Sequence, residues 1–168
     1  MELRGGDLAL RPFEDGDVPA IAAACDDPDT ARFIPGMPCP YTEDDARRYV
    51  ELCRGWWAAG ERCARAIVDA ETGELLGSID VRLGEEGSIG YWVAPGARGR
   101  GVATRALVLL SGWALAEGGV RRLELTTHPE NVASQRVAEK AGFRRVGVRE
   151  DDHAFGDGRR ESVLFERP

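Results

Sequence analysis

"GYWVAPGARGRGVATRALVLL", residues 90–110, joins a strand-like run to a helix-like run. Gly99 and Gly101 stand at the junction, interleaved with Arg98 and Arg100. Glycine weakens both strands and helices, so the bare backbone there needs another explanation. The first N–H groups of a helix have no intrahelical partner, and the helix dipole is positive at that end. Glycines let a large anion reach those groups without meeting a Cβ, so the segment predicts a phosphate site.

A glycine-capped helix start or a tight turn is the structural alternative for this segment. Two other phosphate loops fit poorly. The Walker A pattern GxxxxGK[ST] has no match in the chain. The dinucleotide fingerprint GxGxxG/A fails because its third small residue, Ala103, comes one position early, and too little chain follows for a doubly wound fold. The pattern that fits is [RQ]-x-x-G-x-[GA], filled by Arg98, Gly101 and Ala103.

The flanking sequence alternates between strand and helix patterns. Residues 26–41 hold four of the nine prolines and are expected to form an irregular loop. Thr42 is the expected N-cap of the second helix, with Asp45 completing a capping box. Strands are expected at residues 8–13, 62–69, 75–83, 88–93, 121–127, 143–150 and 161–166, and helices at residues 14–25, 43–59, about 99–117 and 131–142.

The order of these elements predicts the fold class. The strands between residues 62 and 93 are separated by short turns, which favour antiparallel hairpins. The strands on either side of the third helix are expected to pair in parallel, because a helical crossover joins them. We therefore expect one α+β domain over residues 1–168, with a central mixed, largely antiparallel twisted sheet flanked by helices.

Composition narrows the classes of partner. The chain has 168 residues and a formal net charge of −7, which disfavours wrapping of nucleic acid and favours cationic substrates. No apolar run reaches the ~18 residues that span a bilayer, so no membrane partner is expected. The N-terminus lacks the apolar core of a signal peptide, and the four cysteines form no CxxC pair. We expect a cytoplasmic protein with reduced thiols and no metal.

Beyond the glycine segment, the chain resembles the GCN5-related N-acetyltransferase (GNAT) superfamily. The resemblance rests on "GYWVAPGARGRGVATRAL", "NVASQRVAEKAGF", a closing "DG" hairpin and "VLF". These segments, with "LALRPFEDGDVPAI" and "PYTEDDARRYV" near the N-terminus, are similar to the branch that acetylates ribosomal-protein N-termini. Together they cover nearly the whole chain. The resemblance implies a GNAT-like fold and acetyl-CoA as co-substrate, without a metal.

The resemblance also implies a set of residues that bind acetyl-CoA. In the family, the glycine segment binds the pyrophosphate, and a backbone N–H near Val93 faces the thioester oxygen. Packing in the core or sheet is the alternative for Tyr91 and Trp92. The implied cofactor-binding residues are Trp92, Val93, Arg98, Gly99, Arg100, Gly101, Val102, Ala103, Thr104, Asn131 and Ser134.

Asn131 and Ser134 open the fourth helix and lie three residues apart, on one face. Asn131 is the expected N-cap, a role that is compatible with contact to the pantetheine arm. The resemblance implies that Ser134 points at the thioester sulfur and protonates the departing thiolate.

The general base is left open among several residues. Glu124, His128, Asp152 and His153 are the candidates, with a water-relayed base as the alternative. An unperturbed imidazole suits a base near neutral pH. Asp152 and His153 lie at the start of the closing hairpin, where this branch of the family often has an acidic residue that faces the acceptor. The local sequence "REDDHAFGDG" departs from the usual spacing, so the register is open.

The sequence therefore predicts an acetyl-CoA-dependent N-acetyltransferase that acts on a primary amine, with a protein or peptide N-terminus as the first choice of acceptor. A small-molecule amine, such as an aminoglycoside, is the alternative acceptor. A non-catalytic acyl-CoA-binding module is the alternative from another class. The acyl group and the assembly state, including a homodimer, are left open.

Overall fold

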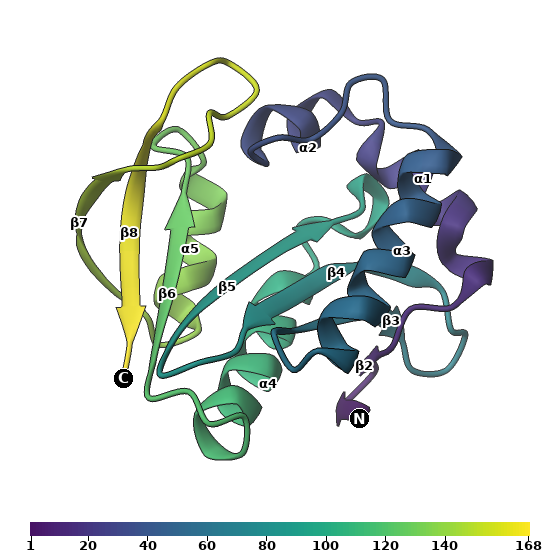
Figure 1. The fold of residues 1–168 in the computed structure, drawn as a ribbon, viewed down its shortest axis with the longest axis horizontal. Coiled ribbons are helices and arrows are strands. Elements are labelled where there is room, and N and C mark those ends of the chain that lie inside the picture. Colours follow the sequence, from purple (N-terminus) through teal and green to yellow (C-terminus); the bar gives the residue numbers. More distant parts are fainter.

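The computed structural model describes residues 1–168 as a single sheet with helices on both faces (Figure 1). The eight strands lie in the order β1-β2-β3-β4-β5-β6-β8-β7. The strands are β1 (Leu3–Gly5), β2 (Leu8–Arg11), β3 (Arg62–Asp69), β4 (Leu75–Arg82), β5 (Glu86–Val93), β6 (Arg122–Thr127), β7 (Arg144–Glu150) and β8 (Glu161–Arg167), and the helices are α1 (Val18–Cys25), α2 (Pro28–Phe33), α3 (Glu43–Ala58), α4 (Val102–Ala116) and α5 (Val132–Lys140).

The strand pairing confirms the expected α+β fold. Every neighbouring pair is antiparallel except β5 and β6, which are parallel and are joined through α4. The crossover therefore has the direction that the sequence predicts. None of the helices combines the length and the apolar character that a membrane span needs.

Two hydrophobic cores lie on the two faces of the sheet. One contains Ile79, Val81 and Ile89 and packs under α4. The other contains Trp92 and packs under α1 and α3. Because side chains alternate along a strand, Ser78 and Asp80 of β4 point to the α1/α3 face. The same rule sends Tyr91 of β5, which packs against the first core, to the α4 face.

The sheet opens between β5 and β6. Only Glu86–Ser88 of β5 pair with Arg122–Glu124 of β6, although β5 continues to Val93 and β6 continues to Thr127. Gly87 lies among the last paired residues, where a Cβ would lie 2.8 Å from the Arg82 carbonyl oxygen and 2.9 Å from Val120. The strands approach closely there and then diverge (Figure 1). We call the gap between residues 89–93 of β5 and 125–127 of β6 the splay.

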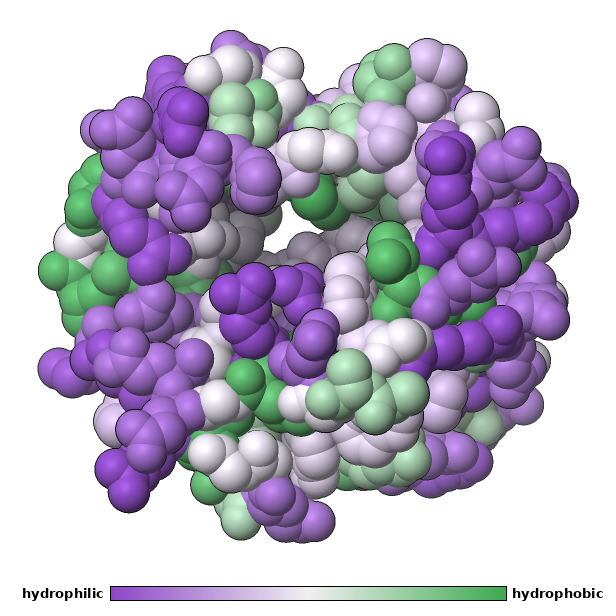
Figure 2. All heavy atoms as spheres, viewed as in Figure 1, coloured by the Kyte–Doolittle hydropathy of each residue, from purple (hydrophilic) through white to green (hydrophobic).

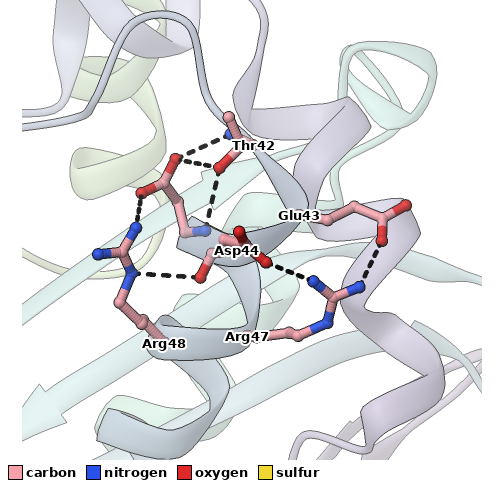
Figure 3. A network of polar contacts seen from close by, with 6 residues as sticks. Thr42, Glu43, Asp44, Arg47 and Arg48 are labelled. Carbon is pink, nitrogen blue, oxygen red and sulfur yellow. Dashed lines mark hydrogen bonds and ion pairs between the residues drawn. The ribbon is translucent and has the colours of Figure 1, made fainter.

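The start of α3 confirms the predicted capping box. The Thr42 hydroxyl oxygen accepts a hydrogen bond from the Asp45 N–H at 3.2 Å, and the Asp45 carboxylate accepts one from the Thr42 N–H at 2.9 Å. Two arginines of the same helix then pair with acidic residues of its first turn (Figure 3). Negative charge at a helix N-terminus also complements the helix dipole.

Several expected boundaries were wrong. Residues 26–41 are not all loop, because α2 forms within them: Asp27 caps it through the Thr30 N–H, and Pro28 occupies the first turn. The short strand β1 was not expected, and β5 begins at Glu86 instead of Ser88. The third helix begins at Val102, not near residue 99, because the glycines before it adopt positive φ.

We expect Thr42→Ala to lower the free energy of unfolding by about 1 kcal/mol, because it removes the N-cap acceptor of α3. The melting temperature should fall by roughly 2–4 °C for a chain of this size. Thr42→Ser keeps the hydroxyl and should stay near wild type. Differential scanning calorimetry of the three proteins provides the measurement, and equal losses for alanine and serine would contradict the capping role.

Candidate functional site

A cavity of about 930 Å³ occupies the splay. Residues of β5, β6, the β5–α4 turn, α2 and α5 line it. Figure 2 shows the corresponding hollow near the middle of one face, between the part of the molecule that holds β6 to β8 and the part that holds α1 to α3. The cavity therefore lies where the sheet opens.

The cavity has one end on each face of the sheet. On the α4 face it is lined by the β5–α4 turn and by α5, including Ser134 and Val137. On the α1/α3 face it is lined by Ile34, Met37 and Tyr49. Two molecules can therefore enter from opposite faces and meet in the splay.

A run of unpaired backbone N–H groups borders the α4 end. Gly99 and Gly101 have φ of 74° and 73°, a conformation that favours glycine. None of the N–H groups of residues 99–104 donates to a protein acceptor, and the first helical bond of α4 runs from the Arg105 N–H to the Gly101 carbonyl. We call residues 99–104 the amide run. Successive free N–H groups at a helix start form an anion site.

The two arginines of this turn differ in their surroundings, and only Arg98 lines the cavity. The Arg98 guanidinium donates to Asp27 at 2.7 Å, to Thr30 at 2.9 Å and to the Val93 carbonyl at 3.3 Å. It thereby ties the turn to α2. Arg100 is exposed, makes no side-chain hydrogen bond and does not line the cavity. Their predicted contact with a phosphate stays a prediction.

The edge of β5 that faces the splay has no strand partner beyond residue 88. The Ala94 N–H donates to the Leu76 carbonyl, so it faces β4. Because N–H directions alternate along a strand, the Val93 N–H faces the splay. This direction is the one that the sequence-based hypothesis requires for Val93. Trp92 also lines the cavity, although its side chain is buried in the α1/α3 core.

A hydroxyl pair spans the cavity on the α4 face. The Tyr91 and Ser134 hydroxyls lie 2.9 Å apart, which joins β5 to α5 across the splay. The Asn131 side chain accepts from the Ser134 N–H at 3.1 Å, which confirms its predicted capping role. Burial raises the pKa of Tyr91 to about 12, so its phenol is neutral at physiological pH. Ser134 therefore has a fixed, neutral hydrogen-bond partner.

His128 closes one wall of the cavity instead of standing on the surface. Its ring is buried and lies between Phe33 and Phe155, with ring centroids at 5.2 and 4.8 Å. Its Nδ1 accepts from the Glu130 N–H at 3.0 Å, so its proton lies on Nε2 and is donated to Asp157 at 2.9 Å. Both ring nitrogens are occupied, which leaves none for a substrate proton.

The other base candidates from the sequence lie away from the cavity. Asp152 and His153 are exposed in the β7–β8 loop and do not line it. Glu124 pairs with Arg149 at 2.7 Å and also does not line it. A catalytic role for Asp152 or His153 would require movement of that loop, and it stays a prediction.

A second group of polar side chains, which no sequence motif marks, lines the α1/α3 end. The Tyr49 and Ser78 hydroxyls lie 2.8 Å apart, and the Arg62 guanidinium lies 2.9 Å from the Asp80 carboxylate. Burial raises the pKa of Asp80 to about 6, against the opposing effect of Arg62. Alternation in "SIDVR" could have placed Ser78 and Asp80 on one face, but no motif marks that face as part of a site.

Comparison with known proteins gives one consistent family. The family model described as acetyltransferase (GNAT) domain matches residues 7–144. An uncharacterised N-acetyltransferase of Bacillus subtilis (strain 168), YnaD, is 31% identical over 144 residues, which cover 83% of this chain and 81% of the relative.

Solved structures share the fold at lower identity. RimJ of Mycobacterium smegmatis, in complex with a CoA-disulfide, superposes with a TM-score of 0.87 at 24% identity, covering 99% of this chain and 85% of its own. RimL, a ribosomal L7/L12 alpha-N-protein acetyltransferase in complex with coenzyme A, has a TM-score of 0.86 at 18% identity, covering 97% and 94%. At these identities the likeness concerns the fold.

We expect His128→Ala to lower the free energy of unfolding by about 2–3 kcal/mol, because it empties a packed site and leaves buried polar partners unpaired. His128→Gln keeps a side-chain donor and should lose less. Urea denaturation measures the change. Amide exchange at Gly156, whose N–H donates to the Arg32 carbonyl beside this cluster, should accelerate in the alanine variant. Wild-type stability and exchange would contradict a structural role.

Proposed function

The chain belongs to the acetyltransferase (GNAT) family and is an acetyl-CoA-dependent N-acetyltransferase, and we propose that its acceptor is the amine at a protein or peptide N-terminus. The observation that carries the proposal is a cavity that passes through the sheet, with the amide run at one end and an apolar wall with polar groups at the other. RimL is described as a ribosomal L7/L12 alpha-N-protein acetyltransferase, which supports a protein acceptor. The proposal places the enzyme in the cytoplasm, where acetyl-CoA meets newly made chains.

The amide run fits the pyrophosphate of acetyl-CoA. A diphosphate needs several hydrogen-bond donors and a positive potential, and free N–H groups at a helix start supply both. Gly99 and Gly101 remove the Cβ atoms that would keep the phosphates away. Val102, Ala103 and Thr104 continue the run and line the cavity. The remaining arm of acetyl-CoA would lie along the splay, toward the Val93 N–H.

The reaction needs a polarised carbonyl and a protonated leaving group. The Val93 N–H faces the splay and can donate to the thioester oxygen, whose negative charge grows during attack. Asn131 holds the first turn of α5 and so fixes the direction of Ser134. The Ser134 hydroxyl, paired with Tyr91, can donate to the sulfur that leaves as a thiolate. The amine would approach from the α1/α3 end.

Purified protein, acetyl-CoA and a panel of acceptors test the acceptor class. N-terminal peptides beginning with small residues should be acetylated faster than aminoglycosides or other small amines, with release of free CoA. Preference for a small amine would replace the acceptor, and binding of acetyl-CoA without any turnover would favour a binding module.

Gly101→Val should weaken acetyl-CoA binding at least about tenfold, which corresponds to ~1.4 kcal/mol. A β-branched side chain is strained at φ of 73° and would crowd the amide run. Its Cβ meets no protein atom within 4 Å, so the fold should persist. Titration calorimetry measures the affinity. Gly96→Val is the matched control, because Gly96 also has open space but no positive φ. Equal affinities for the two variants would contradict the phosphate assignment.

Ser134→Ala should lower kcat by roughly 10- to 100-fold, because one positioned hydrogen bond to the leaving sulfur is lost in the transition state. Acetyl-CoA affinity should change little, since the amide run is intact. Tyr91→Phe leaves the serine in place and should reduce kcat less. Steady-state kinetics with direct cofactor binding separates the effects. Wild-type kcat in Ser134→Ala, with chemistry rate-limiting, would leave Ser134 as a packing residue.

A further inference from the structure

Asp80 occupies the acceptor end of the cavity in a position that is open to a ligand. It lies on β4 directly opposite Gly90 of β5 and points to the α1/α3 face. Its side chain is 22% exposed and lines the cavity. A Cβ at Gly90 would lie 4.0 Å from the Asp80 Oδ1, so the bare glycine leaves that oxygen uncovered.

The two carboxylate oxygens of Asp80 differ in their surroundings. Oδ2 lies 2.9 Å from the Arg62 Nη1. Arg62 is itself held over the Trp56 ring, 4.7 Å from its centroid, so the ion pair has a fixed direction. Oδ1 receives no hydrogen bond from the protein and is not enclosed. One oxygen is therefore anchored, and the other remains a free acceptor for a cation or an N–H group.

The surroundings tune Asp80 toward proton transfer near neutral pH. Burial raises its pKa to about 6, and Arg62 and Arg82 oppose that rise. The other titratable groups whose charge couples to Asp80 are Tyr49 and Cys53 of α3 and Cys63 of β3. Burial raises the pKa of each of these three, so they stay neutral around pH 7. A carboxylate that titrates near pH 6 is a stronger base than an ordinary aspartate and is still ionised at pH 7.

We propose that Asp80 is the catalytic residue that binds the acceptor's ammonium group and removes its proton, and that Arg62 is its positioning residue. The proposal rests on the proposed N-acetyltransferase function and adds the recognition of the amine. The acceptor class is a primary amine, presented beside the apolar wall of Phe33, Ile34 and Met37. The Tyr49–Ser78 hydroxyl pair provides further polar contacts next to it.

During acetyl transfer the ammonium nitrogen of the acceptor loses two protons, and each of them has an acceptor. The Asp80 carboxylate takes one proton from the ammonium and passes it to water. The neutral amine then forms a C–N bond with the thioester carbon, and the C–S bond breaks. The second proton on nitrogen is transferred, through the Ser134 hydroxyl, to the leaving sulfur. The products are the N-acetylated amine and CoA with a free thiol.

The test uses Asp80→Asn, which is nearly isosteric and cannot accept the proton. At pH 7, kcat/KM should fall about 10²- to 10⁴-fold, while acetyl-CoA affinity stays at the wild-type value. The wild-type profile of kcat/KM against pH should have an acidic limb. Along this limb, kcat/KM falls as the pH drops through about 6, because protonated Asp80 is no longer a base. In Asp80→Asn that limb should vanish, and the rate should rise with pH toward the acceptor's own pKa, ~8 for an α-amine.

Arg62→Gln tests the positioning role. Loss of the guanidinium should move the acidic limb to higher pH, since the carboxylate loses a stabilising charge. A merely structural role of Arg62 would change stability without moving the limb. Asp44→Asn is the matched control, because Asp44 is exposed on α3 and pairs only with its own helix (Figure 3).

Two outcomes overturn the assignment. One is an Asp80→Asn enzyme with wild-type kcat/KM and an unchanged acidic limb. The other is loss of that limb in Asp152→Asn or His153→Ala while Asp80→Asn keeps it. An NMR titration provides a readout that does not depend on turnover: the Asp80 carboxyl should titrate near pH 6 and shift to lower pH when an acceptor peptide is added. If the wild-type enzyme acetylates only small amines, the proposal of an N-terminal acceptor is wrong. The role of Asp80 is then tested by measuring the same variants with that small amine.

Discussion

The site depends on the divergence of β5 and β6 after only three paired residues. Across the opening each strand keeps its other neighbour: β5 pairs with β4 from Ile89 to Val93, and β6 pairs with β8 from Leu123 to Thr127. The sheet therefore opens at one place while the strand pairing on both sides continues. Gly87 permits the close approach from which the strands then separate. Without this opening there would be no passage between the two faces.

Strand edges that lose their partner must find another one, because a buried N–H or C=O without a hydrogen bond is costly. In this protein the unpaired edge of β5 borders a cavity instead of a packed core. The free groups are then available to a substrate. Across the far end of the gap, the β7–β8 loop contacts α2 through the Gly156 N–H, and His128 and Phe155 pack beneath that contact. These contacts join the two sides of the opening.

The two ends of the cavity carry different chemistry because they lie on different faces. Free N–H groups and small residues line the α4 end, which suits an anion. A carboxylate, two hydroxyls and apolar side chains line the α1/α3 end, which suits an amine with a short apolar neighbour. Arg98 joins the β5–α4 turn to Asp27, the N-cap residue of α2.

The sequence by itself determined the α+β class, the parallel crossover, the caps at Thr42 and Asn131, and the glycine-rich helix start. These features depend on residues close in sequence, whose periodicity and capping chemistry are visible without coordinates. Local propensity alone predicted the start of α4 too early and did not predict α2, because the segment that contains α2 is rich in proline. Only the tertiary structure decided that the buried His128 ring forms part of the cavity wall, that Arg98 contacts the start of α2 and that Asp80 lines the cavity. Those facts depend on which distant elements meet, and no local pattern along the chain records that.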